Sequence, residues 1–195
     1  MESIYGKHRP EMEQSLNEVI DHISKIRIEL KNRNGMDPVE HSLYRIKAED
    51  SMREKCRRNN LPENEDSALL RLHDAIGVRV VCAFLSDVYA IRDSIKALPD
   101  IAVINEKDYI ANAKPNGYRS YHMILKTKNG YFVEIQLRTI SMDTWASLEH
   151  HMKYKKSLSG NIELLSSELK RCADELASTD VSMQAIRDLI FEDNI

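Results

Sequence analysis

Apolar residues recur with two different periods along this chain, and the change of period divides it into helical ends and a β-rich middle. Residues 12–30 place apolar side chains three and four positions apart, which predicts an amphipathic helix. Residues 162–190 repeat this spacing over four heptads. We therefore expect long helices at about 10–33 and 162–191. Such helices pack on their own domain, join two copies of the chain, or do both.

The second helix carries what we call the C-terminal seam, in which Thr179 is the one polar position. The seam consists of Ile162, Leu165, Leu169, Cys172, Leu176, Thr179, Met183, Ile186 and Ile190.

The middle of the chain predicts a sheet with helices packed on it. The expected strands are Val78–Phe84, Ile101–Tyr109, Ser120–Thr127 and Tyr131–Thr139. Asn129-Gly130 predicts a hairpin turn between the last two, because Asn-Gly readily adopts positive φ. Further helices are expected over 50–59, 87–98 and 141–157. This order indicates the α+β class, with one mixed or antiparallel sheet. We predict one domain over 1–195, with its core at about 42–156.

Composition excludes several classes of protein. With 42% hydrophobic and 30% charged residues, the chain is neither collagen-like nor mainly disordered. No apolar run approaches the roughly 20 residues of a membrane span, so we expect no membrane partner. A net charge of −3 argues against general binding of DNA, although local clusters can still bind anions. Cys56, Cys82 and Cys172 form no CxxC pattern, which favours a reducing cytoplasm.

Basic residues are concentrated between 45 and 58. Six of them fall within fourteen residues: Arg45, Lys47, Arg53, Lys55, Arg57 and Arg58. One interpretation is a solvated helix face with ordinary ion pairs. The other is a polyphosphate clamp, because arginine offers forked donors and a flat stacking surface while lysine offers a point charge.

A carboxylate, Asp74, comes directly before a buried strand that contains a charge, Arg79. A charge within a core strand is costly unless it is paired or used. The pair is therefore either a structural ion pair or a metal-binding carboxylate beside a cleft arginine. The His73-Asp74 sequence also suggests an HD-type phosphohydrolase, but the further spaced ligands of that class are missing.

Two later segments place polar groups beside each other. The turn Lys114–Gly117 is followed at once by a tyrosine, an arginine and a histidine. In the last strand Glu134, Gln136 and Arg138 alternate with apolar residues and so share one face. That face is either plain solvent-exposed surface or the wall of a cleft. The chain has no Walker A loop, zinc spacing or Ser-His-Asp arrangement, so the inventory favours metal-assisted phosphoryl transfer.

Four segments, in this order, resemble the synthetase domain of RelA/SpoT-type alarmone synthetases: HDAIGVRVV, DYIANAKPNGYRSYH, VEIQLRT and SMDTWASLEHHMKYK. The resemblance covers about Ser42–Lys156, and the length resembles the small synthetases that lack hydrolase and regulatory regions. It implies a nucleotidyltransferase-like fold and transfer of pyrophosphate from ATP to the 3′-hydroxyl of GDP or GTP, which yields (p)ppGpp and AMP. It further implies Mg²⁺ as cofactor and a homo-oligomer, with a tetramer favoured.

The resemblance also assigns roles. Asp74 matches a magnesium ligand, and Glu134 matches a second ligand or the group that activates the acceptor hydroxyl. Arg45 and Arg79 match a pair that encloses adenine, and Tyr118 matches a ring that stacks on guanine. The expected contacts to ATP phosphates are Lys47, Ser51, Arg53, Lys55 and Arg58. The other expected acceptor-binding residues are Lys114, Arg119, His122, Gln136, Arg138, Asp143 and His150.

Two positions depart from the family pattern. Asp143 stands where relatives carry Asn or His near the acceptor base, so the choice among GMP, GDP and GTP stays open. His41 stands where some relatives carry an aromatic residue in a regulatory cleft, so activation by product does not transfer.

Two alternative functions stay open. A toxin-type relative would pyrophosphorylate tRNA 3′ ends and would need a basic surface beyond the ATP clamp. Apart from Lys153, Lys155 and Lys156 the chain offers little of it, and RNA binding stays open. A catalytically inactive nucleotide-binding regulator is disfavoured by the two retained carboxylates, Asp74 and Glu134.

Overall fold

The computed structural model describes residues 2–154 and 162–192, and its centre is a five-stranded sheet of order β1-β2-β5-β4-β3. The strands are β1 (Val39–Ile46), β2 (Ile76–Cys82), β3 (Ala102–Asp108), β4 (Tyr121–Lys126) and β5 (Phe132–Thr139). β2 and β5 pair in parallel, and the other neighbours pair antiparallel. The sheet is therefore mixed, which is one of the two arrangements expected from the sequence.

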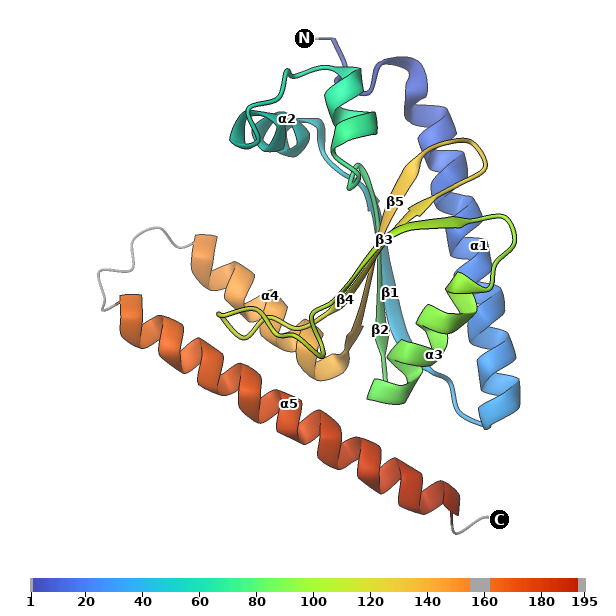
Figure 1. Cartoon of the computed structure of the whole chain (residues 1–195), viewed down its shortest axis with the longest axis vertical. Helices are drawn as coiled ribbons and strands as arrows, with labels where there is room; N and C mark the ends of the chain where they lie inside the picture. Colours follow the sequence, from blue (N-terminus) through green and yellow to red (C-terminus); the bar gives the residue numbers. More distant parts are fainter. Residues whose placement is uncertain (1, 155–161, 193–195) are drawn as a thin grey trace.

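The helices cover both faces of this sheet (Figure 1). They are α1 (Arg9–Asn34), α2 (Glu49–Arg58), α3 (Leu85–Lys96), α4 (Ile140–Tyr154) and α5 (Ile162–Glu192), with a 3₁₀ turn at Gly6–His8 and a π-helical turn at Ser67–Arg71. α1 and α3 lie on one face, while α2, α4 and α5 flank the other (Figure 1). Within the described residues, no helix has both the length and the apolar character of a membrane span.

The prediction of four strands is wrong by one, because the edge strand β1 was missed. Val39 is buried, but Glu40, His41, Leu43 and Arg45 are exposed, so β1 lacks the alternation that marks a half-buried strand. The other predicted strands and helices are present, and Gly130 adopts the positive φ expected of the hairpin turn. Residues 155–157 of the predicted helix 141–157, and with them Lys155 and Lys156, lie outside the described residues.

One face of the sheet is the hydrophobic core. Val80, Met123, Ile135 and Leu137 are fully buried there. They pack beneath α1 and α3, and the apolar seam predicted for α1 faces them. The buried residues of that seam are Met12, Val19, Ile23, Ile26 and Leu30. Successive side chains of a strand point to opposite faces, so the polar residues that alternate with these apolar ones project to the other face of the sheet.

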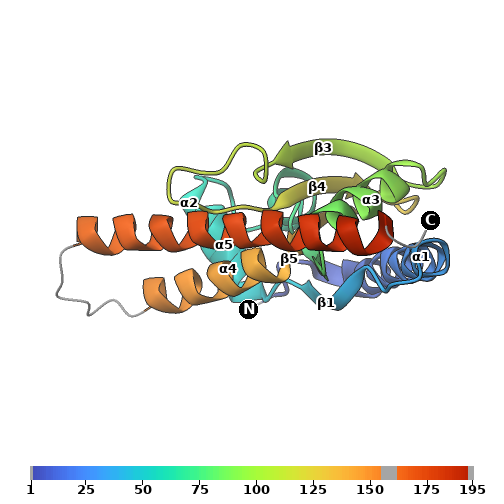
Figure 2. The same cartoon turned by 90° about the horizontal axis from the view of Figure 1, so that it is seen from below.

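The long helix α5 docks through Ala173 and two polar residues, while most of its apolar seam stays exposed. Three residues seven apart, Ala173, Asp180 and Arg187, are buried against the body of the protein. Thr139 Oγ1 donates to Asp180 at 2.6 Å, and Arg187 Nη1 lies 2.8 Å from Asp87. Of the C-terminal seam, Leu165, Met183, Ile186 and Ile190 are exposed, and Leu169 and Leu176 are half-buried. The side chain of Ile162 lies outside the described residues. Figure 2 shows α5 lying along α4 and the sheet.

Replacing Arg187 by Met is expected to destabilise the fold by about 3–5 kcal/mol, because it leaves the buried Asp87 carboxylate without its cation. Urea denaturation at fixed protein concentration measures the loss. Arg171→Met is the matched control, since Arg171 is exposed and pairs only within α5 among the described residues. A change in Arg187→Met no larger than in the control would contradict this account of the docking.

Candidate active site

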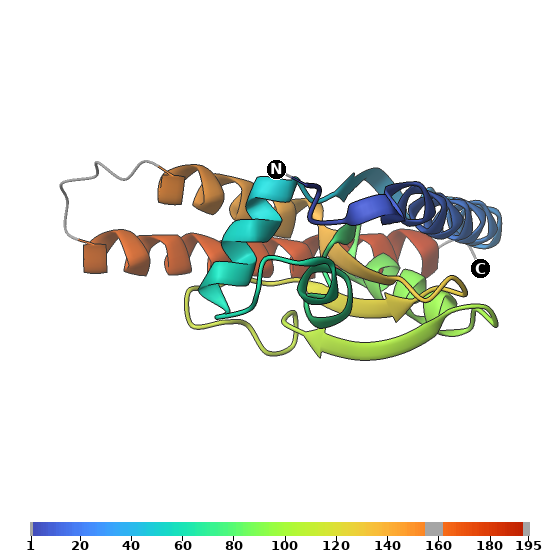
Figure 3. The ribbon, with the colours of Figure 1, turned by 90° about the horizontal axis from the view of Figure 1, so that it is seen from above.

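The strand register gathers polar side chains from all five strands on the second face of the sheet. Residues paired across neighbouring strands project to the same side. One row runs across the sheet as Arg45, Gly77, Glu134, Ile124 and Asn105. The next row runs as Leu43, Arg79, Gln136, His122 and Lys107. α2 and α4 lie over this face near its two ends (Figure 1), and Figure 3 shows both helices on the same side of the sheet.

Three cavities that share lining residues open on this face. The first, of about 390 Å³, contains Asp74 and Glu134 with Lys55, Lys114 and His122. The second, of about 150 Å³, lies at Gly77 and shares Glu134 with the first. The third, of about 370 Å³, is lined by Arg45, Arg79, Tyr118, Arg138 and His150, among others. Together we call them the cleft.

Asp74 is the cleft carboxylate that two lysines contact. Its Oδ2 accepts hydrogen bonds from Lys47 and from Lys55, the latter at 2.6 Å. Burial alone would raise the pKa of Asp74, but these two lysines outweigh it and hold the pKa below its ordinary value. Asp74 is therefore ionised at neutral pH. Its Oδ1 is buried and has no hydrogen-bond partner among the described residues.

Glu134 faces the same cavity from β5. Gln136 Nε2 donates to its Oε2 at 2.9 Å, and His122 Nδ1 lies 3.6 Å from its Oε1. Burial would raise the pKa of Glu134, yet the contact with His122 keeps it below its ordinary value, against the nearby charge of Asp74. Glu134 is thus also ionised and can accept a proton.

The two carboxylates fit a magnesium ion. Mg²⁺ prefers oxygen ligands and is commonly held by one or two carboxylates together with substrate phosphates and water. The unpartnered Oδ1 of Asp74 is an oxygen of this kind. Among residues 2–154 and 162–192, no group of three or more His, Cys, Asp or Glu forms a complete protein-only site. A metal here would therefore share its coordination with a bound substrate.

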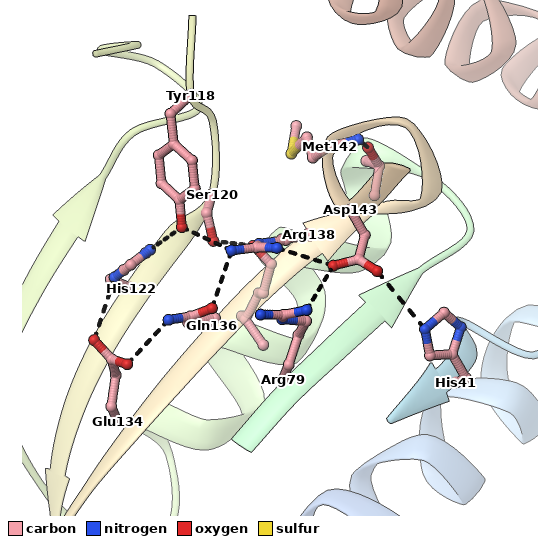
Figure 4. A network of polar contacts seen from close by, with 12 residues as sticks. His41, Arg79, Tyr118, Ser120, His122, Glu134, Gln136, Arg138, Met142 and Asp143 are labelled. Atoms are coloured by element: carbon pink, nitrogen blue, oxygen red, sulfur yellow. Dashed lines mark hydrogen bonds and ion pairs between the residues drawn. The ribbon is translucent and has the colours of Figure 1, made fainter. Parts of the chain in front are cut away.

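A closed ring of polar contacts links Glu134 to Tyr118 (Figure 4). The Tyr118 hydroxyl lies 2.8 Å from His122 Nε2 and accepts from Arg138 Nη2 at 2.9 Å. Arg138 Nη2 also donates to Gln136 Oε1 at 3.1 Å, and Gln136 and His122 both reach Glu134. These contacts hold the aromatic side chain of Tyr118 in a fixed position relative to the carboxylate of Glu134, which can accept a proton.

Asp143, in the first turn of α4, lies between two cleft arginines (Figure 4). Its Oδ1 is 2.9 Å from Arg138 Nη1 and 3.2 Å from Arg79 Nη1, and its Oδ2 is 3.9 Å from His41 Nε2. Burial and the neighbouring charge of Arg138 lower the pKa of Arg79, while Asp143 opposes this. Asp143 thus offsets the repulsion between two partly buried guanidinium groups.

Arg45 and Arg79 line the cleft from neighbouring strands. They stand diagonally on β1 and β2, where such neighbours are about 7–8 Å apart. Gly77, beside Arg45, keeps the floor between them free of a side chain. Both arginines line two of the three cavities.

Four residues expected at the site are not brought to the cleft. Ser51 and Arg58 are exposed on α2 and do not line the cavities described above. Arg53 turns away, since its Nη2 donates to the Glu2 carbonyl oxygen at 2.6 Å. Arg119 points to α5, where its Nη2 donates to Asp174.

Other cleft residues were missed from the sequence. Asn105 and Lys107 on β3, Tyr109 just after it, and His73 line the cavity with both carboxylates. Lys114 Nζ lies 4.5 Å from the ring centre of Tyr109 and 4.7 Å from that of Tyr118. Asn105 and Lys107 stand two positions apart in the expected strand 101–109 and so share a face, but they lie in the continuous polar run 105–108, so their strand neighbours were needed to interpret this signal.

Comparisons with known proteins agree on one family. The profile described as "Region found in RelA / SpoT proteins" matches residues 44–159. The GTP pyrophosphokinase YwaC of Bacillus subtilis (strain 168) is 38% identical over 162 residues, which cover 79% of this chain and 76% of the relative.

Two solved structures of small alarmone synthetase 1 from Bacillus subtilis share the fold. The one bound to its product pppGpp matches with a TM-score of 0.79 and 31% identity, over 92% of this chain and 94% of that one. The one bound to AMPCPP matches with a TM-score of 0.73 and 29% identity, over 93% and 94%.

Proposed function

This chain belongs to the RelA/SpoT family, as a small alarmone synthetase, and we propose that it transfers pyrophosphate from ATP to the 3′-hydroxyl of GDP or GTP. The products are (p)ppGpp and AMP. The observation that carries this proposal is the pair of ionised carboxylates, Asp74 and Glu134, in one cavity lined by lysines.

Asp74 and Glu134 are the residues that would hold Mg²⁺, which neutralises polyphosphate charge when bound. Lys47 and Lys55 reach the same carboxylate, so we expect their ammonium groups to bind ATP phosphates as well. Glu134, oriented by Gln136 and His122, takes the proton of the acceptor hydroxyl. The 3′-oxygen then bonds to the β-phosphorus, and AMP leaves as the α–β bridge breaks.

The two nucleotide bases are assigned to different parts of the cleft. Arg45 and Arg79 would stack on adenine from its two faces, since guanidinium groups stack on flat rings. Tyr118 would stack on guanine. The structures of the synthetase from Bacillus subtilis bound to AMPCPP and to pppGpp support binding of an adenine and a guanine nucleotide, and the assignment of each base to these residues is our proposal. Arg138, Lys114 and His150 line the cleft near Tyr118 and are proposed as further acceptor contacts.

The test is a direct assay. The protein is incubated with ATP and Mg²⁺ and with GMP, GDP, GTP or uncharged tRNA, and AMP release and the pyrophosphorylated product are followed together. We expect product with a guanine nucleotide. Product only with tRNA would establish the toxin-type alternative, and nucleotide binding without AMP release would establish an inactive regulator.

Asp74→Asn is expected to abolish synthesis while the fold stays intact, because the neutral side chain no longer attracts Mg²⁺ or holds Lys47 and Lys55. AMP release is measured over a range of Mg²⁺ concentrations, and a melting curve monitors folding. Full turnover of Asp74→Asn at saturating Mg²⁺ would refute the metal assignment.

Tyr118→Ala is expected to lower kcat/KM for GDP by roughly 5- to 150-fold, since base–aromatic stacking is worth about 1–3 kcal/mol. Tyr118→Phe keeps the ring but loses the contacts of the hydroxyl with His122 and Arg138, so a smaller loss of about 2- to 12-fold is expected. Steady-state kinetics with GDP and ATP varied separately measures both. An unchanged KM for GDP in Tyr118→Ala, with a large fall in melting temperature, would make the residue purely structural.

We also propose that the chain forms a homo-oligomer through the C-terminal seam, with a tetramer favoured by the family. The support is that Leu165, Met183 and Ile186 are exposed on α5 although they form a regular apolar stripe.

We further propose that the protein works in a reducing cytoplasm. The free thiols of Cys56, Cys82 and Cys172 support this location.

Ile186→Glu is expected to lower the particle mass without unfolding the chain, because Ile186 is 51% exposed within one copy. Light scattering at micromolar concentration measures the mass. Ser167→Glu, exposed on another side of α5, is the control and should leave the mass unchanged. A wild-type chain that is monomeric under these conditions would rule out the interface.

A further inference from the structure

The loop of residues 109–120, between β3 and β4, carries Tyr118 and lies against α4 and α5 (Figure 1); we call it the acceptor loop. The loop contacts α5 at Gly117. Gly117 has φ of 91°, and a Cβ there would lie 2.6 Å from the Cβ of Ala173 and 3.3 Å from the Cα of Lys170. The loop backbone is thus packed directly on the helix, with no room for a side chain between them.

Arg119 connects the same two segments. Its Nη1 donates to the carbonyl oxygen of Gly117 at 3.1 Å and to that of Ala173 at 3.3 Å. Its Nη2 donates to Asp174 Oδ1 at 2.9 Å. The forked guanidinium therefore joins a loop carbonyl, a helix carbonyl and a helix carboxylate. These donors are directed at the protein and away from the carboxylates of the cleft.

α4 holds the other side of the acceptor loop. Asn116 Nδ2 donates to Glu149 at 3.3 Å, and the Tyr118 ring lies 6.4 Å from the ring of Trp145. Trp145 in turn donates from Nε1 to the carbonyl oxygen of Leu169 on α5 at 2.8 Å. Tyr118 therefore projects into the cleft from a loop that two helices clamp.

On this basis we infer that Arg119 and Asp174 are positioning residues: they clip the acceptor loop to α5 and so hold Tyr118 where the acceptor base stacks. Arg119 then acts without touching the acceptor. α5, although distant from Asp74 and Glu134 in sequence, becomes part of the acceptor site. The inference rests on the proposed function, because it assigns a support to the acceptor subsite of the same reaction.

Because the clip already orders the loop and Tyr118 in the free enzyme, less conformational entropy is lost when the acceptor binds. Breaking the clip should therefore raise the KM for GDP and leave the KM for ATP unchanged, since Arg45 and Arg79 stand on strands that the clip does not contact. We expect a rise of about 5- to 20-fold in Arg119→Ala and a smaller rise in Asp174→Ala, because Arg119 also bonds two carbonyl oxygens.

The experiment is a double-mutant cycle of Arg119→Ala and Asp174→Ala with steady-state kinetics for GDP and ATP. If Arg119 acts through the clip, adding Asp174→Ala to Arg119→Ala raises the KM for GDP no further. Arg171→Ala, an arginine that pairs with Glu168 and Glu175 inside α5, is the matched control and should leave all constants unchanged.

A second readout does not depend on turnover. Trp145 is the only tryptophan of the chain, so intrinsic fluorescence reports the packing beside the acceptor loop. Release of the loop should increase quenching of Trp145 by acrylamide in Arg119→Ala and in Asp174→Ala, but not in Arg171→Ala.

Three results would overturn the inference. A rise in the KM for GDP in Arg119→Ala, with no effect of Asp174→Ala and no change in quenching, would mean that Arg119 binds the acceptor directly. Unchanged KM values in both variants would mean that the clip has no role. An equal loss for both substrates, together with a lower melting temperature, would mean a general structural role. Wild-type kinetics in the same experiment tests the proposed function separately, since the inference concerns only the ratios of variants to wild type.

Discussion

The cleft depends on carboxylates placed among cations. Arg79 and Arg138 stand on neighbouring strands and would repel each other, and Asp143 lies between them. Lys47 and Lys55 converge on Asp74 in the same way. Buried like charges are costly unless an opposite charge compensates them. These pairs therefore allow one face of the sheet to be densely charged while the opposite face forms the hydrophobic core.

The same pairing prepares the cleft for a polyphosphate. Side chains that are already held by Asp74 need little further ordering when phosphate oxygens arrive, so less conformational entropy is lost on binding. Glu134 accepts a hydrogen bond from Gln136 and lies near His122, and the contact with His122 keeps the pKa of its carboxyl below the ordinary value. Catalysis by position and charge, without a covalent protein intermediate, suits such an arrangement.

The sequence predicted the buried half of the fold better than the charged half. Strands such as β5 were found because alternation marks a half-buried strand, and the same alternation placed Glu134 on a shared polar face. β1 was missed because its side chains line a cleft and lack an apolar stripe. Arg53 and Arg119 were grouped with the site by their position in motifs, but a motif does not fix a rotamer. Glu2 and Asp174, far away in the sequence, determine where these two side chains point.

α5 has two faces of opposite character. Its polar face is buried: Asp180 and Arg187 bind groups on β5 and α3, and each polar group needs its partner there because water is excluded. Most of its apolar seam is exposed, with only Leu169 and Leu176 half-buried among the described residues, which is the reverse of an ordinary surface helix. A helix that docks by hydrogen bonds is fixed in register and direction, because hydrogen bonds are directional while apolar contacts are not. That register places Ala173 against Gly117, so the position of the acceptor loop follows from how α5 docks.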